Sequence, residues 1–252
     1  LGFHLCRYGY GSSEQLRTVI ARNRALGIPY EVQWTDIDYM DHYRDWTYDN
    51  TSFEGLPEIV DDLHQYGQKH IMIIDPGISN QVPGQYPPYD EGVTDDIFVK
   101  NASGGLLIGK VWPGDTVFPD WTHPKVGDYW YRQAKSYHDQ VAFDGIWIDM
   151  NEPSSSYPGS KYGCTNDSLD NPPYIPGVLG GSLRVNTLCS SAKQYYSTHY
   201  NLHSMYGFGE GIATNYALTK LLNKRSIVIS RSTYAGHGHY AGHWSGDISS
   251  TW

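Results

Sequence analysis

The chain has 252 residues and a formal net charge of −9, and 18% of its residues are charged while 14% are aromatic. This length suffices for one large domain with a well-buried core or for two small ones. Because no cluster of lysines or arginines accompanies the negative net charge, the composition argues against binding to the phosphate backbone of nucleic acids. No apolar stretch approaches the roughly 20 residues that cross a bilayer, so any targeting segment is expected outside this chain.

Short apolar segments alternate with longer segments of helical periodicity. Strands are expected at 3–6, 30–34, 70–75, 145–149, 226–230 and 243–247, and helices at about 13–26, 56–67, 125–141 and 210–224. Ser12 or Ser13 can cap the first helix, and Gly27 can end it. Because a strand, a helix and a second strand in succession form a parallel crossover unit, the sequence predicts an α/β fold with a parallel sheet.

Two parallel α/β folds fit this alternation, namely an open doubly wound sheet and a closed (β/α)8 barrel. No Gly-rich phosphate-binding fingerprint follows the first strand, which disfavours a dinucleotide-binding sheet. Charged residues lie at or just past the carboxyl ends of predicted strands, where barrel active sites are assembled. These residues are Asp36, Asp75, Asp149, Arg231 and Asp247. We therefore predict a partial TIM-type barrel that contains about the first six strands.

Two stretches, 78–124 and 152–200, are too long for simple loops. Both are rich in Gly, Pro, Asn, Tyr and Ser, and both follow strand ends, so they are predicted to be insertions on the barrel rim that wall a pocket. In the second stretch, Cys164 and Cys189 are expected to form a disulfide that would pin an otherwise flexible segment. Cys6 ends an apolar run and is expected to be a buried free thiol.

Three Asn-x-Ser/Thr sequons are candidate glycosylation sites, at Asn50, Asn101 and Asn166. Glycosylation and a disulfide both belong to an oxidising secretory route. The sequence therefore predicts entry into the secretory pathway.

The segment "GIWIDMNEPSSS", residues 145–156, places Asp149 directly after the apolar run of a buried strand. The segment "HYAGHWSGDISSTW", residues 239–252, places Asp247 at the end of another predicted strand. Taken alone, Asp149 could instead cap the next turn or pair with an arginine. Glycosidases need two carboxyl groups that flank the scissile bond, and acids from two strand ends can meet across a barrel mouth. Asp149 and Asp247 are therefore candidate catalytic acids.

Several longer segments resemble the catalytic-domain motifs of glycoside hydrolase family 31, and the resemblance covers essentially the whole chain in order. The segments are "LGFHLCRYGYGS", "QWTDIDYMD", "GKVWPGDTVFPD", "GIWIDMNEPS", "STHYNLHSMYGFGEGIA" and "SRSTYAGHGHYAGHWSGD". The resemblance implies a retaining α-glucosidase that removes terminal, non-reducing, α-linked glucose without a cofactor or a metal. It implies α-1,4-linked and also α-1,6-linked substrates, such as maltose, maltooligosaccharides, glycogen and starch.

The same resemblance implies a role for each matching residue. Asp149 matches the nucleophile and Asp247 the general acid/base, while Arg231 would bind substrate hydroxyls and help to keep Asp149 charged. Glu152 is expected to orient the site from behind the residues that touch substrate. The residues that match the walls and contacts of the glucose site are Asp36, Ile78, Trp112, Trp147, Met150 and Trp244.

The resemblance also implies what this chain lacks. A complete barrel of the family continues past "HWSGD" and is flanked by β domains, so residues 1–252 are expected to form an incomplete catalytic barrel. Activity is therefore expected of the parent protein rather than of this segment alone. The implied compartment is the lysosome, with a secreted or membrane-tethered enzyme as the alternative.

Other functions remain open on the sequence. An α-xylosidase or another activity of the family is compatible with the same two acids, and so is a carbohydrate-binding paralogue without turnover. A metal-dependent hydrolase is the rival from another chemical class, because His237, His239 and His243 precede Asp247 closely and imidazoles with a carboxylate are usual zinc ligands. No second histidine cluster follows another predicted strand, so no metal site is predicted.

Overall fold

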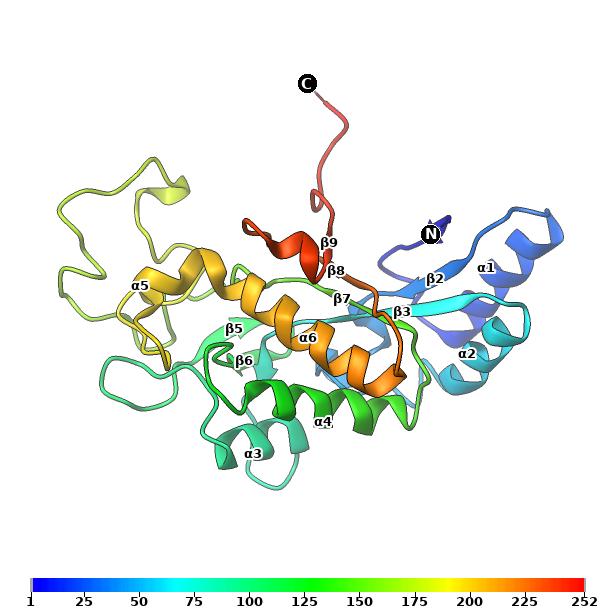
Figure 1. Ribbon diagram of the computed structural model, residues 1–252, viewed down its shortest axis with the longest axis horizontal. Helices are drawn as coiled ribbons and strands as arrows, with labels where there is room; N and C mark the ends of the chain where they lie inside the picture. The colour runs from blue at the N-terminus through cyan, green and yellow to red at the C-terminus, as the bar shows by residue number, and fades with distance from the viewer. Residues whose placement is uncertain (1, 252) are drawn as a thin grey trace.

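A computed structural model describes residues 2–251 of the chain, and its centre is a curled sheet of parallel strands (Figure 1). Its strands, in spatial order, are β1 (His4–Leu5), β2 (Val32–Thr35), β3 (Lys69–Ile74), β7 (Gly145–Ile148), β8 (Val228–Ser230) and β9 (Gly242–His243). Each neighbouring pair is parallel, and the spatial order is the chain order. A doubly wound sheet reverses its strand order at a switch point, whereas a barrel adds each strand beside the last. The prediction of a partial (β/α)8 barrel with six strands is therefore confirmed.

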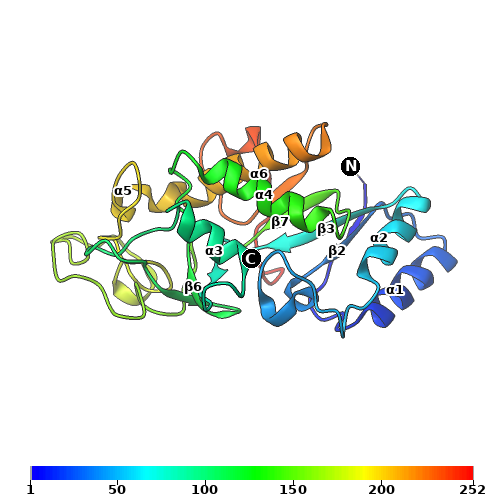
Figure 2. The ribbon, with the colours of Figure 1, turned by 90° about the horizontal axis from the view of Figure 1, so that it is seen from below.

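Four long helices connect the strands, as the sequence predicts. They are α1 (Ser13–Ala25), α2 (Leu56–Gln65), α4 (Val126–His138) and α6 (Tyr206–Leu222). Helices α1 and α2 pack together at one end of the curled sheet, and α4 and α6 pack together at the other end (Figure 2). The Ser12 hydroxyl accepts a hydrogen bond from the Gln15 N–H at 3.2 Å, and Gly27 follows the helix with φ of +65°. The expected cap and stop of the first helix are thus confirmed.

Burial of the central strands fixes the carboxyl edge of the sheet. The side chains of β3 from Ile71 to Ile74 and of Ile146 and Ile148 in β7 are at most 1% exposed. Each fully buried aliphatic side chain contributes about 1.5–3 kcal/mol relative to an exposed one. On the helical side, the Trp130 indole N–H donates to the Thr214 hydroxyl at 2.9 Å and joins α4 to α6. The residues at the ends of β3 and β7 are therefore held in place by a tightly packed core.

The segment between β3 and β7 forms a small sheet of its own. Strands β4 (Ile78–Ser79), β6 (Gly114–Val117) and β5 (Gly109–Val111) pair antiparallel in that order, and α3 (Pro87–Thr94) lies between β4 and β5 in the chain. The segment between β7 and α6 contains mainly turns and α5 (His199–Leu202). The short 3-10 helices of the structure are η1 (Ile37–Tyr39), η2 (Asp41–Tyr43), η3 (Leu179–Gly181), η4 (His203–Met205) and η5 (His237–His239).

Two expectations at the edges of the parallel sheet are wrong. The last strand ends at His243 rather than at Asp247, because the following segment runs away from the sheet (Figure 1) and has no paired neighbour among the described residues. Cys6 is exposed rather than buried. It lies just past β1, which is an edge strand that pairs only with β2 in the described sheet, so Cys6 lacks a covering neighbour on that side.

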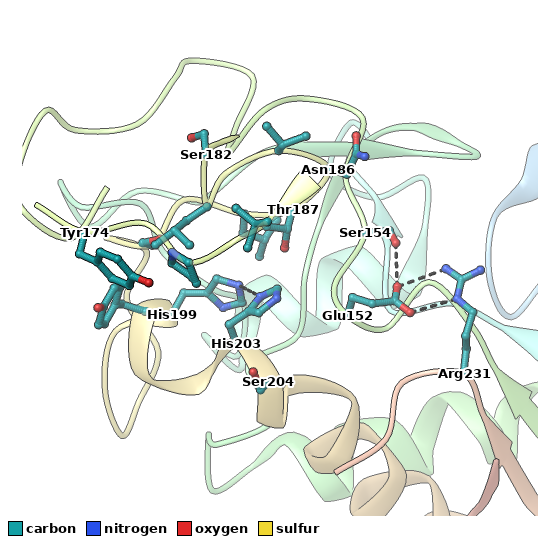
Figure 3. A pocket seen from close by; sticks show the side chains of 17 residues that line it. Glu152, Ser154, Tyr174, Ser182, Asn186, Thr187, His199, His203, Ser204 and Arg231 are labelled. Atoms are coloured by element: carbon teal, nitrogen blue, oxygen red, sulfur yellow. Dashed lines mark hydrogen bonds and ion pairs between the residues drawn. The ribbon is translucent and has the colours of Figure 1, made fainter. Parts of the chain in front are cut away.

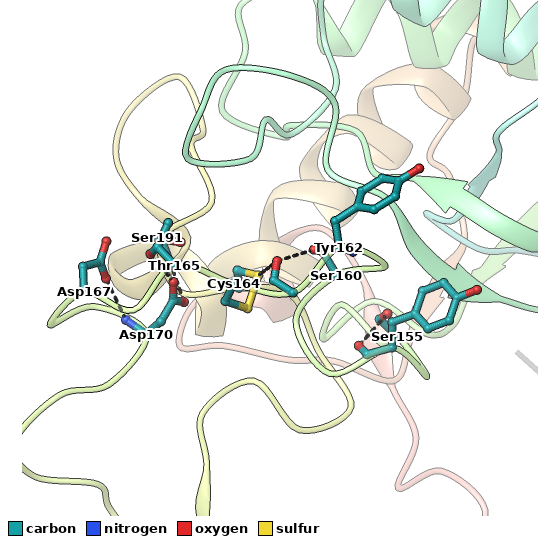
Figure 4. Close-up of a disulfide and its surroundings, with 11 residues drawn as sticks. Ser155, Ser160, Tyr162, Cys164, Thr165, Asp167, Asp170 and Ser191 are labelled. Atoms are coloured by element: carbon teal, nitrogen blue, oxygen red, sulfur yellow. Dashed lines mark hydrogen bonds between the residues drawn. A yellow bond between two sulfur atoms is a disulfide. The ribbon is translucent and has the colours of Figure 1, made fainter.

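The expected disulfide between Cys164 and Cys189 is present (Figure 4). The two Cα atoms are 5.5 Å apart, and 25 positions separate the cysteines in the sequence. Gly159 lies against this bridge with φ of +81°, and a Cβ atom there would lie 2.0 Å from the Cys164 sulfur. Only glycine therefore fits beside the disulfide without displacing it.

None of the helices between residues 2 and 251 combines the length and the apolar character that crossing a membrane requires.

The disulfide generates a prediction about local stability. Closing a loop of about 25 residues contributes roughly 3 kcal/mol by restricting the unfolded chain. We expect Cys164→Ser combined with Cys189→Ser to speed proteolytic cleavage within residues 165–188, measured by limited proteolysis and mass spectrometry. Cys6→Ser is the control, because Cys6 is a free cysteine. Equal cleavage rates in the double variant and the unchanged protein would contradict this role of the bridge.

Candidate active site

Four of the predicted charged residues are the first residues past four parallel strands. Asp36 follows β2, Asp75 follows β3, Asp149 follows β7, and Arg231 follows β8. Since the carboxyl ends of parallel strands lie at one edge of the sheet, these residues come to one face, which is the active-site face of a barrel. The sequence-based placement of these four residues is thus confirmed.

The Arg231 guanidinium lies between two carboxylates from the turn after β7. Its Nη1 is 3.0 Å from Asp149 Oδ1, and its Nε is 3.0 Å from Glu152 Oε1. Its Nη2 also lies 3.2 Å from Glu152 Oε2, so the contact with Glu152 is bidentate (Figure 3). The Ser154 hydroxyl donates to Glu152 Oε2 at 2.8 Å. Bidentate, charge-assisted contacts of this kind fix geometry as well as charge, so Glu152 orients Arg231, and Arg231 in turn contacts Asp149.

The amide of Asn151 joins the turns that follow β7 and β8. Its Nδ2 donates to the Ser230 hydroxyl at 2.9 Å, and its Oδ1 accepts from the Ser232 N–H at 3.0 Å, on either side of Arg231. The Asn151 side chain is fully buried. Gly207 in α6 leaves room for this turn, since a Cβ there would lie 2.7 Å from the Asn151 carbonyl oxygen. Asn151 was not predicted as a site residue, although its position between the two acids of "DMNE" was an available signal.

The environment of Asp149 changes its acidity. Burial raises the pKa of the Asp149 carboxyl to about 6, and the negative charges of Glu152 and Asp247 add to that rise. The Arg231 guanidinium and the Met150 N–H, which donates to Asp149 Oδ1 at 2.8 Å, oppose it. Arg231 is therefore a partner of Asp149 as expected, but burial outweighs its effect on the pKa.

Asp36 and Asp75 differ in accessibility. Asp36 is partly buried, its Oδ1 accepts from the Ile37 N–H at 2.6 Å, and burial raises its pKa to about 6. Asp75 is 3% exposed, and its N–H donates to Asp45 Oδ1 at 2.7 Å. Burial raises the pKa values of Asp75 and Asp45 well above the usual range.

Asp247 lies in the exposed segment four residues after β9, so it is not at a strand end as predicted. Its negative charge nevertheless contributes to the raised pKa values of Asp149 and Asp36, after the larger effect of burial on each. Asp247 is therefore near the same face as the other acids. No hydrogen bond or ion pair of the Asp247 side chain is found among the described residues.

Aromatic side chains line the sheet beside these acids. The Trp147 ring centroid is 5.4 Å from that of Trp34 and 5.4 Å from that of Trp244, and the contact with Trp244 is edge to face. Trp34 was not predicted as a site residue, although it precedes Asp36 by two positions on the same strand and its adjacent turn. Trp34 and Trp147 are 9% and 7% exposed and belong to the hydrophobic core, and Trp244 is partly buried against that core.

The other predicted wall residues separate into two groups. Trp112, which is 51% exposed, and Met150 line one cleft of about 500 Å³ together with Ser154 and Asn186. Ile78 is fully buried and pairs with Val117 in the antiparallel sheet, so its side chain belongs to the hydrophobic core. Its assignment as a substrate contact stays a prediction.

A second and larger cavity begins at Glu152 and Arg231 and extends beneath the long insertion (Figure 3). Its volume is about 770 Å³. Its walls come from residues 174–190 on one side and from α5 and the following turn on the other. Arg231 and Glu152 thus lie between Asp149 at the end of β7 and this cavity.

His237, His239 and His243 belong to no group of three close ligand atoms among the described residues. Among residues 2–251, one group alone brings three ligand atoms together, and it consists of Cys164, Asp170 and Cys189. The two thiols of that group are joined in the disulfide and are not available as thiolate ligands. The His243 imidazole instead contacts the Ser230 carbonyl oxygen at 3.1 Å.

The sequons lie in loops or turns. Asn50 and Asn166 are exposed. The Asn101 side-chain oxygen accepts from the N–H groups of Ser103 and Gly105 at 2.9 and 3.1 Å within a turn. Glycosylation at these three positions stays a prediction.

Curated proteins of known activity are similar to this chain over its whole length. The chain is 52% identical over 253 residues to the lysosomal alpha-glucosidase of Mus musculus, covering 100% of this chain and 26% of the relative. It is 44% identical over 257 residues to the intestinal sucrase-isomaltase of Homo sapiens, covering 100% of this chain and 14% of the relative. The expected resemblance to α-glucosidases is thus confirmed.

A solved structure of the glucosidase II alpha subunit, bound to Glc1Man2, matches the fold with a TM-score of 0.83 and 27% identity, covering 100% of this chain and 25% of that one. The chain therefore spans about a quarter or less of the length of these relatives. A family model described as the TIM-barrel domain of glycosyl hydrolases family 31 matches residues 1–252. With the barrel strands, the acids at their carboxyl ends and these similarities in agreement, the chain belongs to glycosyl hydrolase family 31.

Proposed function

We propose that this chain is the catalytic barrel segment of a retaining α-glucosidase, with Asp149 as the nucleophile and Asp247 as the general acid/base. The observation that carries the proposal is the position of Asp149 at the end of β7, partly buried and paired with Arg231 at 3.0 Å. A nucleophilic carboxylate needs a fixed orientation and a low exposure to water, and this turn provides both.

The proposed reaction has two steps. Asp149 attacks the anomeric carbon, the glycosidic C–O bond breaks, and the Asp247 carboxyl transfers its proton to the departing oxygen. A water molecule then attacks the same carbon, Asp247 takes the proton of that water, and the bond to Asp149 breaks. Two inversions at one carbon give net retention, so the first product is α-glucose.

Other residues serve binding in this proposal. Asp36 accepts hydrogen bonds from sugar hydroxyls, Arg231 donates to them, and Trp147 and Trp244 cover the sugar face. Trp112, Met150 and Ile78 are proposed wall residues. Arg231 and Glu152 orient Asp149 through their ion pairs.

The relatives support a proposal about the substrate class. They include a lysosomal alpha-glucosidase, a sucrase-isomaltase and a glucosidase II subunit that has been solved with Glc1Man2. We propose terminal α-1,4-linked glucose, and also α-1,6-linked glucose, of maltose, maltooligosaccharides, glycogen or starch as the substrate. We place the intact protein in the secretory pathway, with the lysosome as its destination, since the disulfide and the lysosomal relatives support this compartment.

The roles of the two acids make different predictions for two types of substrate. We expect Asp149→Asn in the intact protein to abolish release of α-glucose from both maltose and an aryl α-glucoside with an acidic phenol, because the nucleophile is lost. Asp247→Asn should lower maltose hydrolysis by about 10²–10⁴-fold. The same variant should form the glycosyl-enzyme from the aryl glucoside nearly normally, because an acidic phenol departs without a proton.

These outcomes are measured by NMR of the first anomer released and by the burst of phenol in rapid kinetics. A first product with the β configuration would contradict retention. Near-normal maltose turnover by the Asp149→Asn variant would show that this carboxylate is not the nucleophile.

The pKa of Asp149 makes a prediction about pH. As a nucleophile Asp149 acts in its ionised form, so kcat/KM should fall as the pH drops through about 6. The substitution Glu152→Gln removes a negative charge that raises the pKa of Asp149. The positive charge of Arg231, which lowers this pKa, stays beside Asp149. The pKa of Asp149 should therefore decrease, and the acid limb of the pH profile should move to lower pH by roughly half a unit to one unit.

Glu91→Gln is the matched control for the pH profile. Glu91 also binds an arginine Nε at 3.0 Å, that of Arg132, but between α3 and α4 on the surface. The control should leave the acid limb in place. An acid limb that is unchanged, or moves to higher pH, in Glu152→Gln would contradict the proposed coupling.

A further inference from the structure

A series of hydrogen bonds runs from a buried carboxylate to the wall of the larger cavity. Asp120, which follows β6 and is 5% exposed, lies with its Oδ1 3.2 Å from Gln194 Nε2. The Gln194 side-chain oxygen lies 3.1 Å from His199 Nδ1, and His199 Nε2 lies 3.0 Å from His203 Nδ1 (Figure 3). This hydrogen-bonded series, Asp120 to His203, joins both insertions to η4, and the two-step reaction above uses none of its members.

Both histidines of the series are neutral at neutral pH. His199 is 2% exposed, and burial lowers its pKa to about 3. Burial also lowers the pKa of His203, and the negative charge of Glu152 opposes this effect. A neutral imidazole has one N–H and one nitrogen with a free lone pair, so its neighbours decide which nitrogen carries the proton.

The carboxylate at the start of the series sets the direction of every hydrogen bond. Asp120 accepts from the N–H and the hydroxyl of Thr122 at 2.9 and 2.6 Å, as an ionised carboxylate does. The Gln194 amide therefore turns its NH₂ group to Asp120 and its oxygen to His199. That oxygen accepts, so His199 carries its proton on Nδ1 and accepts through Nε2. His203 then donates through Nδ1, which leaves the lone pair on its Nε2.

The acceptor nitrogen of His203 lies on the side of the ring away from His199. His203 and Glu152 both line the cavity, and Figure 3 shows Glu152 between His203 and Arg231. The Glu152 carboxylate contacts Arg231 in a bidentate manner. Since the carboxylate and His203 Nε2 are both acceptors, a molecule with two O–H donors, such as water, can join them. Such a bridge holds the carboxylate on the side that faces away from Arg231.

We propose that His203 is a positioning residue for the α-glucosidase reaction, which acts on Asp149 through Glu152 and Arg231 and is set as an acceptor by the series that starts at Asp120. The inference rests on the proposed function, because it concerns the placement of the nucleophile. Without the bridge to His203, the Glu152 carboxylate is free to rotate. Arg231, which lies 3.0 Å from Asp149, then loses part of its orientation.

Two substitutions of His203 in the intact protein separate the roles of its nitrogens. An asparagine amide replaces Nδ1, so His203→Asn keeps the hydrogen bond to His199 and loses the acceptor near Glu152. We expect it to lower kcat/KM for maltose by about three- to tenfold, the effect of one hydrogen bond. A glutamine amide reaches the place of Nε2, so His203→Gln should lower kcat/KM by less than about twofold. A structural role alone predicts the opposite order.

A double-mutant cycle tests whether His203 acts through Glu152. In a Glu152→Ala background, His203→Asn should change kcat/KM by less than about twofold, because the carboxylate that it positions is gone. An aryl α-glucoside with an acidic phenol keeps these slow variants measurable. His138→Asn, which changes a partly buried histidine at the end of α4, is the control and should leave kcat/KM unchanged in both backgrounds.

A third measurement breaks the series further from the site. Gln194→Met removes the acceptor of the His199 N–H, so both histidines can change tautomer, and we expect kcat/KM to fall by about two- to fivefold. Gln133→Met is the matched control, because Gln133 also donates to a carboxylate, that of Glu91 at 2.8 Å, but between α4 and α3. Its kcat/KM should stay unchanged.

Three results would overturn the inference while α-glucosidase activity remained. They are equal losses in His203→Asn and His203→Gln, equal effects of His203→Asn with and without Glu152, and unchanged kcat/KM in Gln194→Met. Failure of the proposed function would look different, since the unchanged protein would then hydrolyse neither maltose nor the aryl glucoside.

Discussion

The contact of one guanidinium with two carboxylates is the interaction on which the site depends. Arg231 starts the turn after β8, whereas Asp149 and Glu152 belong to the turn after β7, so the contact requires these strands to be neighbours in register. The hydrophobic core of β3 and β7 supplies the rigid base, and Asn151 locks the two turns together. A shift of either turn by about 1 Å would weaken every member of this arrangement, because bidentate contacts tolerate little displacement.

The same arrangement places several acids at the sheet edge beside Arg231. Burial raises the pKa values of Asp149, Asp36 and Asp75, so the folded state disfavours their charged forms. An ionised Asp149 above pH 6 therefore lowers the stability of the fold, and this loss is relieved as the pH falls from 6 toward the unfolded value near 3.8. Function and stability are opposed here, as is usual where an active site needs a partly desolvated charge.

The sequence predicted the parts of the molecule that local patterns determine. Apolar runs located β2, β3 and β7, helical periodicity located the four long helices, and the first residue after each strand located Asp149 and Arg231. The features that were predicted wrongly or missed depend on contacts between segments that are distant in the sequence. The early end of β9 and the exposure of Cys6 follow from missing neighbours at the sheet edges, and the role of Asn151 follows from two hydroxyl and amide partners about 80 positions away. A local sequence pattern does not show which distant segments will become neighbours in the fold.

The disulfide at the base of the second insertion has a consequence for a molecule exposed to digestive or degradative proteases. Surface loops with small and polar residues are the preferred sites of nicking, and residues 165–188 contain many exposed positions. A single cut there produces two polypeptides, yet the Cys164–Cys189 bond keeps them joined as one covalent unit. The nicked protein would migrate as one band without a reducing agent and as two bands with it, so a cut in this loop would release neither part.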